Sequence, residues 1–297
     1  MEHVLTLIAS SGTTLGGDAV AAVTKALGRL GADVGSRIWL ARDQACDLTF
    51  ANLSCDQADA AARRVLGPAS VDVLAQPLAG RRKQILVADM DSTFIAEETL
   101  DELAALVGIK DKVAAITARA MNGELDFAKA LRERVAMLAG LSTGALEETW
   151  QQMNFVPGGR TLVRTMVAAG ATCVLVSGGF KFFTSRVRDA CGFDLDVAND
   201  LEIENGALTG RVIEPIVDRN VKLQTLKQIA SDRNVPLRLT ASVGDGANDL
   251  PMLQASGLGV AFHARPAGTA AAPHRIDHGD LRTILFAQGY KAAEFID

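Results

Sequence analysis

The sequence lacks several features that would mark particular classes of protein. No apolar run approaches the ~20 residues that a membrane-spanning helix needs, and residues 1–3 lack the cationic start of a signal peptide. There are only 4 cysteines, without the paired spacing of a metal site, which predicts reduced thiols and a cytoplasmic protein. The net charge of −5 disfavours nucleic acid as a partner.

The composition that remains is that of an ordinary globular protein. Hydrophobic residues make up 48% of the chain and charged residues 22%. A chain of 297 residues is long enough for one large domain and a smaller one. The short basic run Arg81-Arg82-Lys83 is interpreted as a solvated lead-in to a strand and not as a targeting signal.

The first 76 residues predict a small α+β domain. Strands are expected at 4–9, 34–41, 45–53 and 71–74, and helices at 18–30 and 56–66. This βαββαβ order is typical of a ferredoxin-like domain. Residues 77–83, which contain Pro77 and Gly80, are the expected linker to the rest of the chain.

Residues 85–93 are the stretch around which the larger part of the chain is organised. Four apolar residues, 85–88, predict a buried parallel strand. Asp89 and Asp91 follow at its carboxyl end, where ligands bind in open α/β sheets, and two such carboxylates can share a divalent cation. Ser92 and Thr93 add hydroxyl and N–H groups that can hold an anion. Taken alone, this pattern still favours a solvated turn.

A second acidic motif lies far downstream, at residues 244–249. Residues 240–243 predict a short strand, and the glycines of the motif permit a tight turn after it. Asp245 could complete a magnesium site with Asp89 and Asp91. Two strand-terminal acidic motifs in one chain are far less expected by chance than one, so the pair favours a chemical site.

Between these motifs the strand pattern is interrupted. Helices are expected at 98–107, 110–120 and 127–138, and no strand is expected before residue 172, which predicts a helical cap at about 97–155 inserted after the first core strand. The elements expected afterwards are helix 158–169, strand 171–176, helix 182–190, strand 195–198, a hairpin at 204–206 and helix 220–230. The alternation predicts an α/β fold with a Rossmann-like, doubly wound parallel sheet over residues 84–297.

Four motifs taken together resemble those of the haloacid dehalogenase-like hydrolases. They are DMDST at 89–93, SGG at 177–179, Lys222 and GDGAND at 244–249. Cap segments at 98–103, 121–123 and 127–135 resemble the phosphoserine phosphatases within that family, and the resemblance covers about residues 84–288. The N-terminal domain, 1–76, resembles ACT-like regulatory modules. That likeness implies an amino-acid ligand or a homodimer, and a packing domain without a ligand stays open.

The resemblance implies a magnesium-dependent phosphatase that hydrolyses O-phosphoserine through an aspartyl phosphate, the last step of serine biosynthesis, with no nucleic-acid or membrane partner. Asp89 is the implied nucleophile and Asp91 the general acid and base. Magnesium would be held by Asp89, Asp245 and the backbone carbonyl at Asp91, with Thr93 and Asp249 in support. The implied substrate-binding residues are Glu98, Met121, Phe127, Arg134, Ser177, Gly178, Lys222 and Asn248.

Each of these residues also has a plainer interpretation. Residues 177–179 could be only a turn, Lys222 an exposed helix lysine, Glu98 and Arg134 surface charges of the cap, and Met121 and Phe127 core side chains. The joint pattern favours the chemical interpretation. Two alternatives stay open: a phosphatase or phosphotransferase of the same fold for another small phosphomonoester, and a catalytically idle amino-acid-sensing protein.

Overall fold

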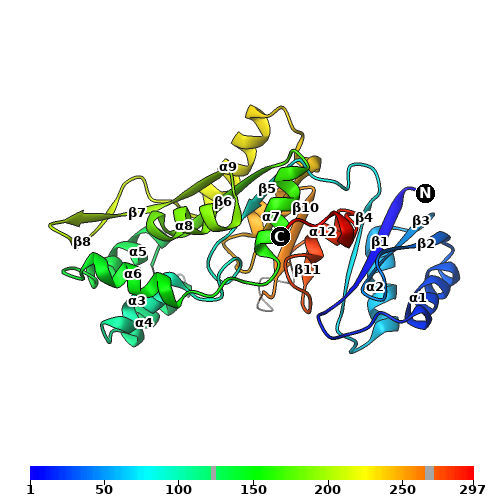
Figure 1. The fold of residues 1–297 in the computed structure, drawn as a ribbon, viewed down its shortest axis with the longest axis horizontal. Helices are drawn as coiled ribbons and strands as arrows, with labels where there is room; N and C mark the ends of the chain where they lie inside the picture. Colours follow the sequence, from blue (N-terminus) through cyan, green and yellow to red (C-terminus); the bar gives the residue numbers. More distant parts are fainter. Residues whose placement is uncertain (122–124, 265–270) are drawn as a thin grey trace.

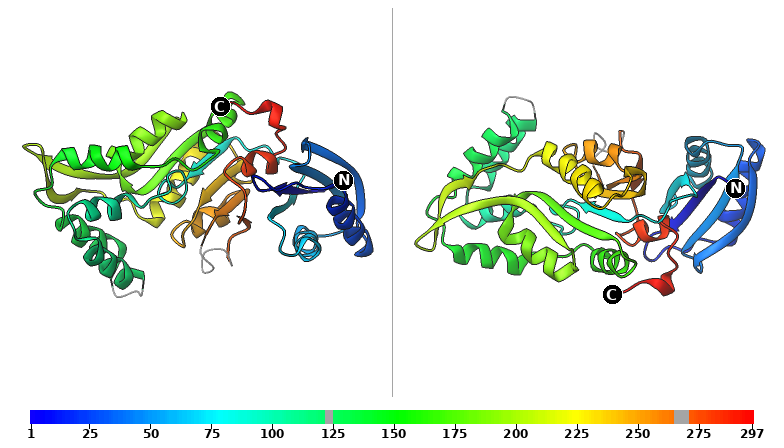
Figure 2. Two further views of the ribbon diagram at one scale, coloured as in Figure 1. Left: turned by 60° about the horizontal axis from the view of Figure 1, so that its bottom comes forward. Right: turned by 90° about the horizontal axis from the view of Figure 1, so that it is seen from above.

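The computed structural model describes residues 1–121, 125–264 and 271–297, and these build two β-sheets and a helical cap. The smaller sheet contains β1 (His3–Ala9), β2 (Asp33–Ala41), β3 (Ala45–Ala51) and β4 (Val71–Pro77). The molecule is elongated, with the smaller sheet at one end, the cap at the other and the larger sheet between them (Figures 1 and 2).

The strands of the smaller sheet are antiparallel in the order β2-β3-β1-β4, and they have the βαββαβ element order that the sequence predicts. Helices α1 (Gly17–Arg29) and α2 (Cys55–Leu66) cover one face, where residues such as Leu5, Leu27 and Phe50 form a core. On the other face, Ile8 and Leu74 join the core of the larger domain. The smaller sheet is therefore buried on both faces, unlike a freely tethered module.

The basic run at 81–83 is not a solvated lead-in, and that interpretation is wrong. The Arg81 guanidinium donates to both carboxylate oxygens of Asp47, at 2.6 and 3.1 Å, and to the carbonyl oxygen of Ala287 at 2.9 Å. Lys83 is 7% exposed and donates to two backbone carbonyl oxygens. Arg82 is the exposed member of the run. The predicted linker is thus fastened between the two domains by partners that lie far away in the sequence.

Asp72 makes a second connection between the domains. Its carboxylate is fully buried and accepts the backbone N–H groups of Asp277, His278 and Gly279, at 2.8, 3.2 and 2.7 Å. Nearby, the side-chain amide of Gln76 donates to Ala287 O at 2.7 Å. The C-terminal segment of the chain therefore holds the N-terminal sheet against the larger domain.

The larger sheet has the order β11-β10-β9-β5-β6-β7-β8 and is parallel except for the β7–β8 pair. Its strands are β5 (Ile85–Ala88), β6 (Thr172–Phe180), β7 (Leu195–Glu204), β8 (Ala207–Ile213), β9 (Thr240–Gly244), β10 (Leu258–Phe262) and β11 (His274–Ile276). The central strand, β5, is fully buried. This confirms the prediction of a buried parallel strand in an α/β fold.

Helices cover both faces of the larger sheet. One face packs on α7 (Gly159–Ala168), α8 (Lys181–Cys191) and α12 (Thr283–Ala287), and the other on α9 (Arg219–Asp232) and α10 (Leu250–Ala255). Alternate residues of β5 point to the two layers, with Leu86 in the first core and Val87 in the second. Two short 3₁₀ helices, Leu237–Leu239 and Ala292–Glu294, complete the described elements.

The cap contains α3 (Thr99–Leu106), α4 (Lys110–Met121), α5 (Phe127–Ala136) and α6 (Thr143–Gln152). The sequence predicts the first three, and α6 is an additional helix. The predicted hairpin joins β7 to β8 at Asn205 and Gly206, both with positive φ. It extends from the larger sheet to the cap (Figure 1).

Backbone hydrogen bonds tie the cap to this hairpin. The N–H of Gly140 donates to Leu208 O at 2.8 Å, and the N–H of Leu208 donates to Leu141 O at 2.8 Å. At Gly210, a Cβ atom would lie 2.9 Å from Cβ of Ala139, so the cap and the hairpin approach each other too closely for a larger residue. The cap is therefore supported by a hairpin that follows it in the sequence only after α7, β6 and α8.

In the described ranges, no helix combines the length and apolar character that crossing a membrane requires. The four cysteines are all free thiols, and three of them are buried.

Candidate active site

The strands that carry the sequence motifs are neighbours in the larger sheet, in the order β9-β5-β6. Because these strands are parallel, their carboxyl ends lie at the same edge. Asp89 follows β5, Ser177 lies near the end of β6 and Asp245 follows β9. The fold thus brings together residues that are up to about 150 positions apart in the sequence.

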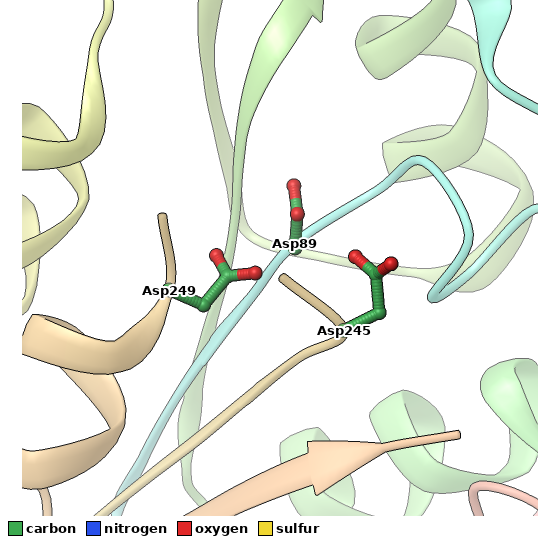
Figure 3. Close-up of side chains that lie close together, drawn as sticks. All are labelled: Asp89, Asp245 and Asp249. Atoms are coloured by element: carbon green, nitrogen blue, oxygen red, sulfur yellow. The ribbon is translucent and has the colours of Figure 1, made fainter. Parts of the chain in front are cut away.

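Three carboxylates converge at this edge. Asp89, Asp245 and Asp249 each have an oxygen atom within 4.8 Å of the others. Figure 3 shows the three side chains facing one another from the end of β5, the loop after β9 and the start of α10. Asp89 is 5% exposed and Asp249 is fully buried, while Asp245 is half-buried. We refer to these three residues as the carboxylate cluster.

Lys222, in the first turn of α9, is the cation of this cluster. Its Nζ donates to Oδ2 of Asp89 at 2.8 Å and to Oδ1 of Asp249 at 2.7 Å, and the residue is 1% exposed. Burial acts to lower the pKa of Lys222, but the carboxylates of Asp249 and Asp89 outweigh it and raise that pKa. The ammonium is therefore held in its charged form.

One ammonium does not balance three carboxylates. Burial and then the charge of Asp249 raise the pKa of Asp89 well above its ordinary value, against the effect of Lys222. Burial, Asp249 and Glu98 raise the pKa of Asp245 to about 6. Hard oxygen ligands at this spacing, with uncompensated negative charge, fit a divalent cation such as Mg²⁺.

The carboxylate of Asp91 lies outside the cluster. Its Oδ1 accepts the backbone N–H of Thr99 at 3.0 Å, and its Oδ2 accepts the hydroxyl of Ser177 at 3.2 Å. Burial and the charge of Glu98 raise the pKa of Asp91 to about 7, although the hydrogen bonds from Thr99 and Ser177 act in the opposite direction. Such a carboxyl group can both donate and accept a proton near neutral pH.

Residues 177–179 form an irregular, bulged segment of β6 beside Asp91, which we call the 177–179 turn. The Ser177 hydroxyl oxygen accepts the N–H of Gly179 at 2.8 Å. A Cβ atom at Gly179 would lie 2.8 Å from Oδ2 of Asp91, and one at Gly178 would lie 3.2 Å from the ring of Phe127. Both glycines therefore permit a close approach, and the second contact places the first residue of α5 against this turn.

Two charged residues of the cap region are linked to this site by electrostatics: the charge of Glu98 acts on Asp91 and Asp245, and Arg134 interacts with Glu98. Glu98 is exposed, and its Oε1 accepts the Ser92 hydroxyl at 2.8 Å. Arg134 is half-buried and donates to Ala130 O and to Thr117 Oγ1, both at 3.3 Å. Burial lowers the pKa of Arg134, while the charges of Asp101 and Glu98 act to raise it.

The Arg134 guanidinium makes no ion pair within 4.0 Å with any carboxylate in the described part of the chain. Both of its hydrogen bonds are long and go to neutral oxygens. The carboxylates of Asp101 and Glu98 act on its charge from beyond ion-pair distance.

The remaining residues of the predicted site have different environments. Asn248 is exposed and its Oδ1 lies against Gly246, whose N–H donates to Oδ2 of Asp249 at 3.1 Å. Thr93 is fully buried, and its hydroxyl has no hydrogen-bond partner among the described residues. The side chain of Met121 lies outside the residues that the structure describes.

Two contacts of the site involve residues that the sequence analysis does not predict. Thr99 donates its N–H to Asp91, and Asn199 donates its side-chain amide to the carbonyl oxygen of Gly178 at 2.8 Å. Thr99 carries no side-chain signal because the donor is its backbone. Asn199 carries a weak one, since it is a polar residue in the middle of a strand.

Comparisons with known proteins agree with this geometry. Residues 86–254 match the family model of the haloacid dehalogenase-like hydrolases. Over 201 residues the chain is 46% identical to the phosphoserine phosphatase of Idiomarina loihiensis, an alignment that covers 68% of this chain and 91% of that protein. It is also 44% identical to phosphoserine phosphatase SerB2 of Mycobacterium tuberculosis, in an alignment of 233 residues that covers 78% of this chain.

This chain spans only 57% of the length of the Mycobacterium relative. Among solved structures, it resembles a probable phosphoserine phosphatase from Vibrio cholerae with a TM-score of 0.79 and 28% identity, over 99% of this chain and 88% of that one. The likeness to the Vibrio structure extends over both the smaller sheet and the larger one.

Proposed function

Because this chain belongs to the haloacid dehalogenase-like hydrolases, we propose that it is a phosphoserine phosphatase. It is a phosphoric monoester hydrolase that converts O-phospho-L-serine and water to L-serine and phosphate, the last step of serine biosynthesis. The observation that carries this proposal is the pair of carboxyl groups after β5. Asp89 lies in the carboxylate cluster beside Lys222, and Asp91 is held apart from it with a raised pKa.

The two carboxyl groups suit two successive displacements at phosphorus. A carboxylate oxygen of Asp89 attacks the phosphorus atom, the bond from phosphorus to the serine oxygen breaks, and Asp91 gives its proton to that oxygen. Water then attacks the phosphorus of the aspartyl phosphate and gives a proton to Asp91, and the bond to Asp89 breaks. Proton transfer by a positioned group of this kind contributes typically ~10²–10⁴-fold to a rate.

Magnesium is the proposed cofactor. Asp89, Asp245 and the backbone carbonyl at Asp91 would hold it, with Asp249 and Thr93 in support. When bound, it offsets negative charge on the phosphoryl oxygens and the carboxylates. The spacing and the charge imbalance of the carboxylate cluster support this assignment.

The phosphoryl oxygens would be bound by the Ser177 hydroxyl, the Gly178 backbone, Lys222 and Asn248. Phosphoryl transfer needs compensation of the negative charge on these oxygens in the transition state. The buried, charged Lys222 and the close approach of the 177–179 turn to Asp91 support these roles.

The amino-acid part of the substrate has two charges that need partners. The Arg134 guanidinium offers a planar fork of donors to the substrate carboxylate, and the exposed Glu98 carboxylate receives the ammonium group. Phe127, which contacts the phosphate-binding turn, and Met121 would form the apolar lining. The absence of a carboxylate partner for Arg134 among the described residues supports this orientation.

A panel of small phosphomonoesters, assayed with and without Mg²⁺, tests the proposal. Phosphoserine should be hydrolysed with the highest kcat/KM and only with the metal. Arg134→Ala should lose about 2–5 kcal/mol of transition-state binding on phosphoserine and much less on p-nitrophenyl phosphate, which has no carboxylate. Arg132→Ala, on the same helix, is the matched control, because Arg132 is exposed and pairs with Glu214.

Each alternative gives a different result in these assays. Equal losses for Arg134→Ala on both substrates would mean that Arg134 serves the fold or the phosphate, and the phosphoserine assignment would lose its main support. A parent enzyme that prefers another phosphomonoester would be the related phosphatase or phosphotransferase. A parent without any hydrolysis would be the catalytically idle protein.

The N-terminal sheet is proposed as an ACT-like domain over residues 1–76, with a regulatory or dimerising role in a cytoplasmic enzyme. Its βαββαβ order supports this assignment. Calorimetric titration of the full chain with serine and glycine tests for an amino-acid ligand, and sedimentation tests for a homodimer. If neither amino acid gives heat of binding, the domain is a packing domain without an amino-acid ligand.

A further inference from the structure

We propose that Asn199, on β7, is a positioning residue that fixes the phosphate-binding turn to the segment that leads into Lys222. The inference rests on the proposed function, because it requires residues 177–179 and Lys222 to bind the phosphoryl group. Asn199 itself does not touch the substrate in this account. It acts through the backbone of Gly178 and Val217.

The turn at 177–179 is an irregularity in the pairing of β6 with β7. Val176 pairs with Val197, and the next pair is Phe180 with Asn199. Three residues of β6 therefore lie opposite one residue of β7. Backbone groups in such a bulge lose their regular partners and need others.

Asn199 supplies one of these partners. Its Nδ2 donates to the carbonyl oxygen of Gly178 at 2.8 Å. The N–H at the other end of the same peptide, that of Gly179, donates to the Ser177 hydroxyl oxygen at 2.8 Å. The peptide between the two glycines is thus held at both ends, and its orientation sets the orientation of the turn.

The other side of the Asn199 amide binds a second segment. Its Oδ1 accepts the N–H of Val217 at 2.7 Å, and its Nδ2 also lies 3.3 Å from Val217 O. The next residue, Asp218, caps α9 by accepting N–H groups of its first turn. Lys222 lies in that turn, so one side chain connects the two segments that are proposed to hold the phosphoryl group.

Burial makes these contacts difficult to replace. Asn199 is 1% exposed, and Val217 is 7% exposed. Water therefore cannot readily substitute for the amide, and a buried carbonyl without a donor is costly. A purely structural asparagine would matter for stability alone. Asn199 differs because a shift of about 1 Å in reacting groups can cost ~10²-fold in rate.

Two substitutions separate these roles. Asn199→Leu removes both hydrogen-bonding functions at similar size. Asn199→Asp keeps an acceptor for Val217 but loses the donor to Gly178. The control is Thr184→Val, because fully buried Thr184 donates to Asp196 of β7 at 2.7 Å and does not contact the turn.

For both Asn199 variants, kcat/KM should fall by about 10–100-fold, equally on phosphoserine and on p-nitrophenyl phosphate, because both substrates share the phosphoryl group. The affinity of both variants for inorganic phosphate should fall as well, and titration calorimetry in the presence of Mg²⁺ measures it. Thr184→Val should lower the melting temperature and leave both quantities unchanged.

Asn199 variants that melt earlier but keep parental kcat/KM and phosphate affinity would overturn the proposal. If Asn199→Leu does not fold, Asn199→Asp decides by the same criteria. A parent that hydrolyses no phosphomonoester refutes the proposed function. In that case, a loss of phosphate affinity in the variants would still support the positioning role.

Discussion

Buried carboxylates form the centre of two regions of the molecule, the domain contact and the candidate active site. Their negative charge is compensated in the first region and left in excess in the second. At the domain contact, Asp47 receives hydrogen bonds from Arg81 and from Thr6, and Asp72 receives three backbone N–H groups. In the carboxylate cluster, the ammonium of Lys222 pairs with two of the three carboxylates, those of Asp89 and Asp249.

This difference distinguishes carboxylates that stabilise the domain contact from carboxylates that suit a reactive site. Carboxylates with a full set of donors stabilise the position that they occupy, and removing a donor is costly. Carboxylates whose pKa values are raised by each other and by burial are destabilised when charged, and a cation relieves that cost. The domain contact is therefore balanced by groups of the protein, whereas the candidate site carries excess negative charge that suits a cation.

The largest expected effect is that of Asp89→Asn. An amide cannot accept the phosphoryl group, so we expect kcat to fall by about 10⁴-fold or more. The fold should persist, and the melting temperature should not fall, because the substitution removes one of the mutually repelling charges. Rapid-quench labelling should detect an acid-stable, base-labile phosphoenzyme in the parent and none in the variant. Near-parental turnover in the variant would contradict the mechanism.

Metal removal should have the next largest effect. Treatment with a chelator should reduce phosphatase activity to background, and added Mg²⁺ should restore it. A cation that binds only the folded protein stabilises it by about 2.7 kcal/mol at a concentration one hundred times its Kd, so Mg²⁺ should also raise the melting temperature. Asp245→Asn should weaken both responses. A melting temperature that does not change with Mg²⁺ would argue against a metal in the carboxylate cluster.

At the domain contact, Arg81→Met should affect stability and not chemistry. It leaves Asp47, whose side chain is 4% exposed, without its cation, and breaking such a buried pair costs about 3–5 kcal/mol. Urea unfolding measures the loss, and kcat/KM of the folded fraction should stay parental. Arg82→Met is the control, since the Arg82 side chain is 50% exposed and its ion pair with Glu294 contributes about 0–1 kcal/mol. Similar losses in both variants would remove the special role of Arg81.

The smallest effect concerns pH. Burial, and then the charges of Lys83 and Arg63, lower the pKa of His274 to about 4 from an ordinary value of 6.5. Between these values the unfolded chain binds the proton and the folded one does not, so stability falls as the pH falls from 6.5 to 4. His274→Asn should flatten this dependence relative to the parent, and the exposed His278 provides the control substitution. If the free energy of unfolding depends on pH in the same way for the parent and for His274→Asn, the assigned role of His274 is wrong.

Local patterns in the sequence predicted the parts of the molecule that depend on neighbouring residues. The buried strand β5, the two acidic motifs and the β7–β8 hairpin are of this kind, because apolar runs and turn residues act over a few positions. Parallel strands then bring their carboxyl ends together as a consequence of topology. The existence of the candidate site could therefore be predicted without coordinates.

What the sequence could not provide depends on distant partners. The sequence around Arg81 predicts a solvated charge, because its hydrogen-bond acceptor Ala287 lies 206 residues away. The expected supporting role of Asp249 agrees with its contact with Lys222, but spacing within the motif does not show that its carboxylate also faces those of Asp89 and Asp245. Asn199 gives only a weak signal as a polar residue within a strand, and its role follows from the irregular pairing of β7 with β6.

The hydrogen bonds between the cap and the β7–β8 hairpin have a consequence for how such enzymes can be recombined. In the sequence, the cap looks like one insertion at about 97–155 that could be exchanged between relatives to change substrate choice. In the fold it is a module in two pieces, because Gly140 and Leu141 pair with Leu208. A transplant of 97–155 alone would place a foreign cap on a hairpin shaped for another one. The transferable unit therefore includes the hairpin, residues 195–213, as well.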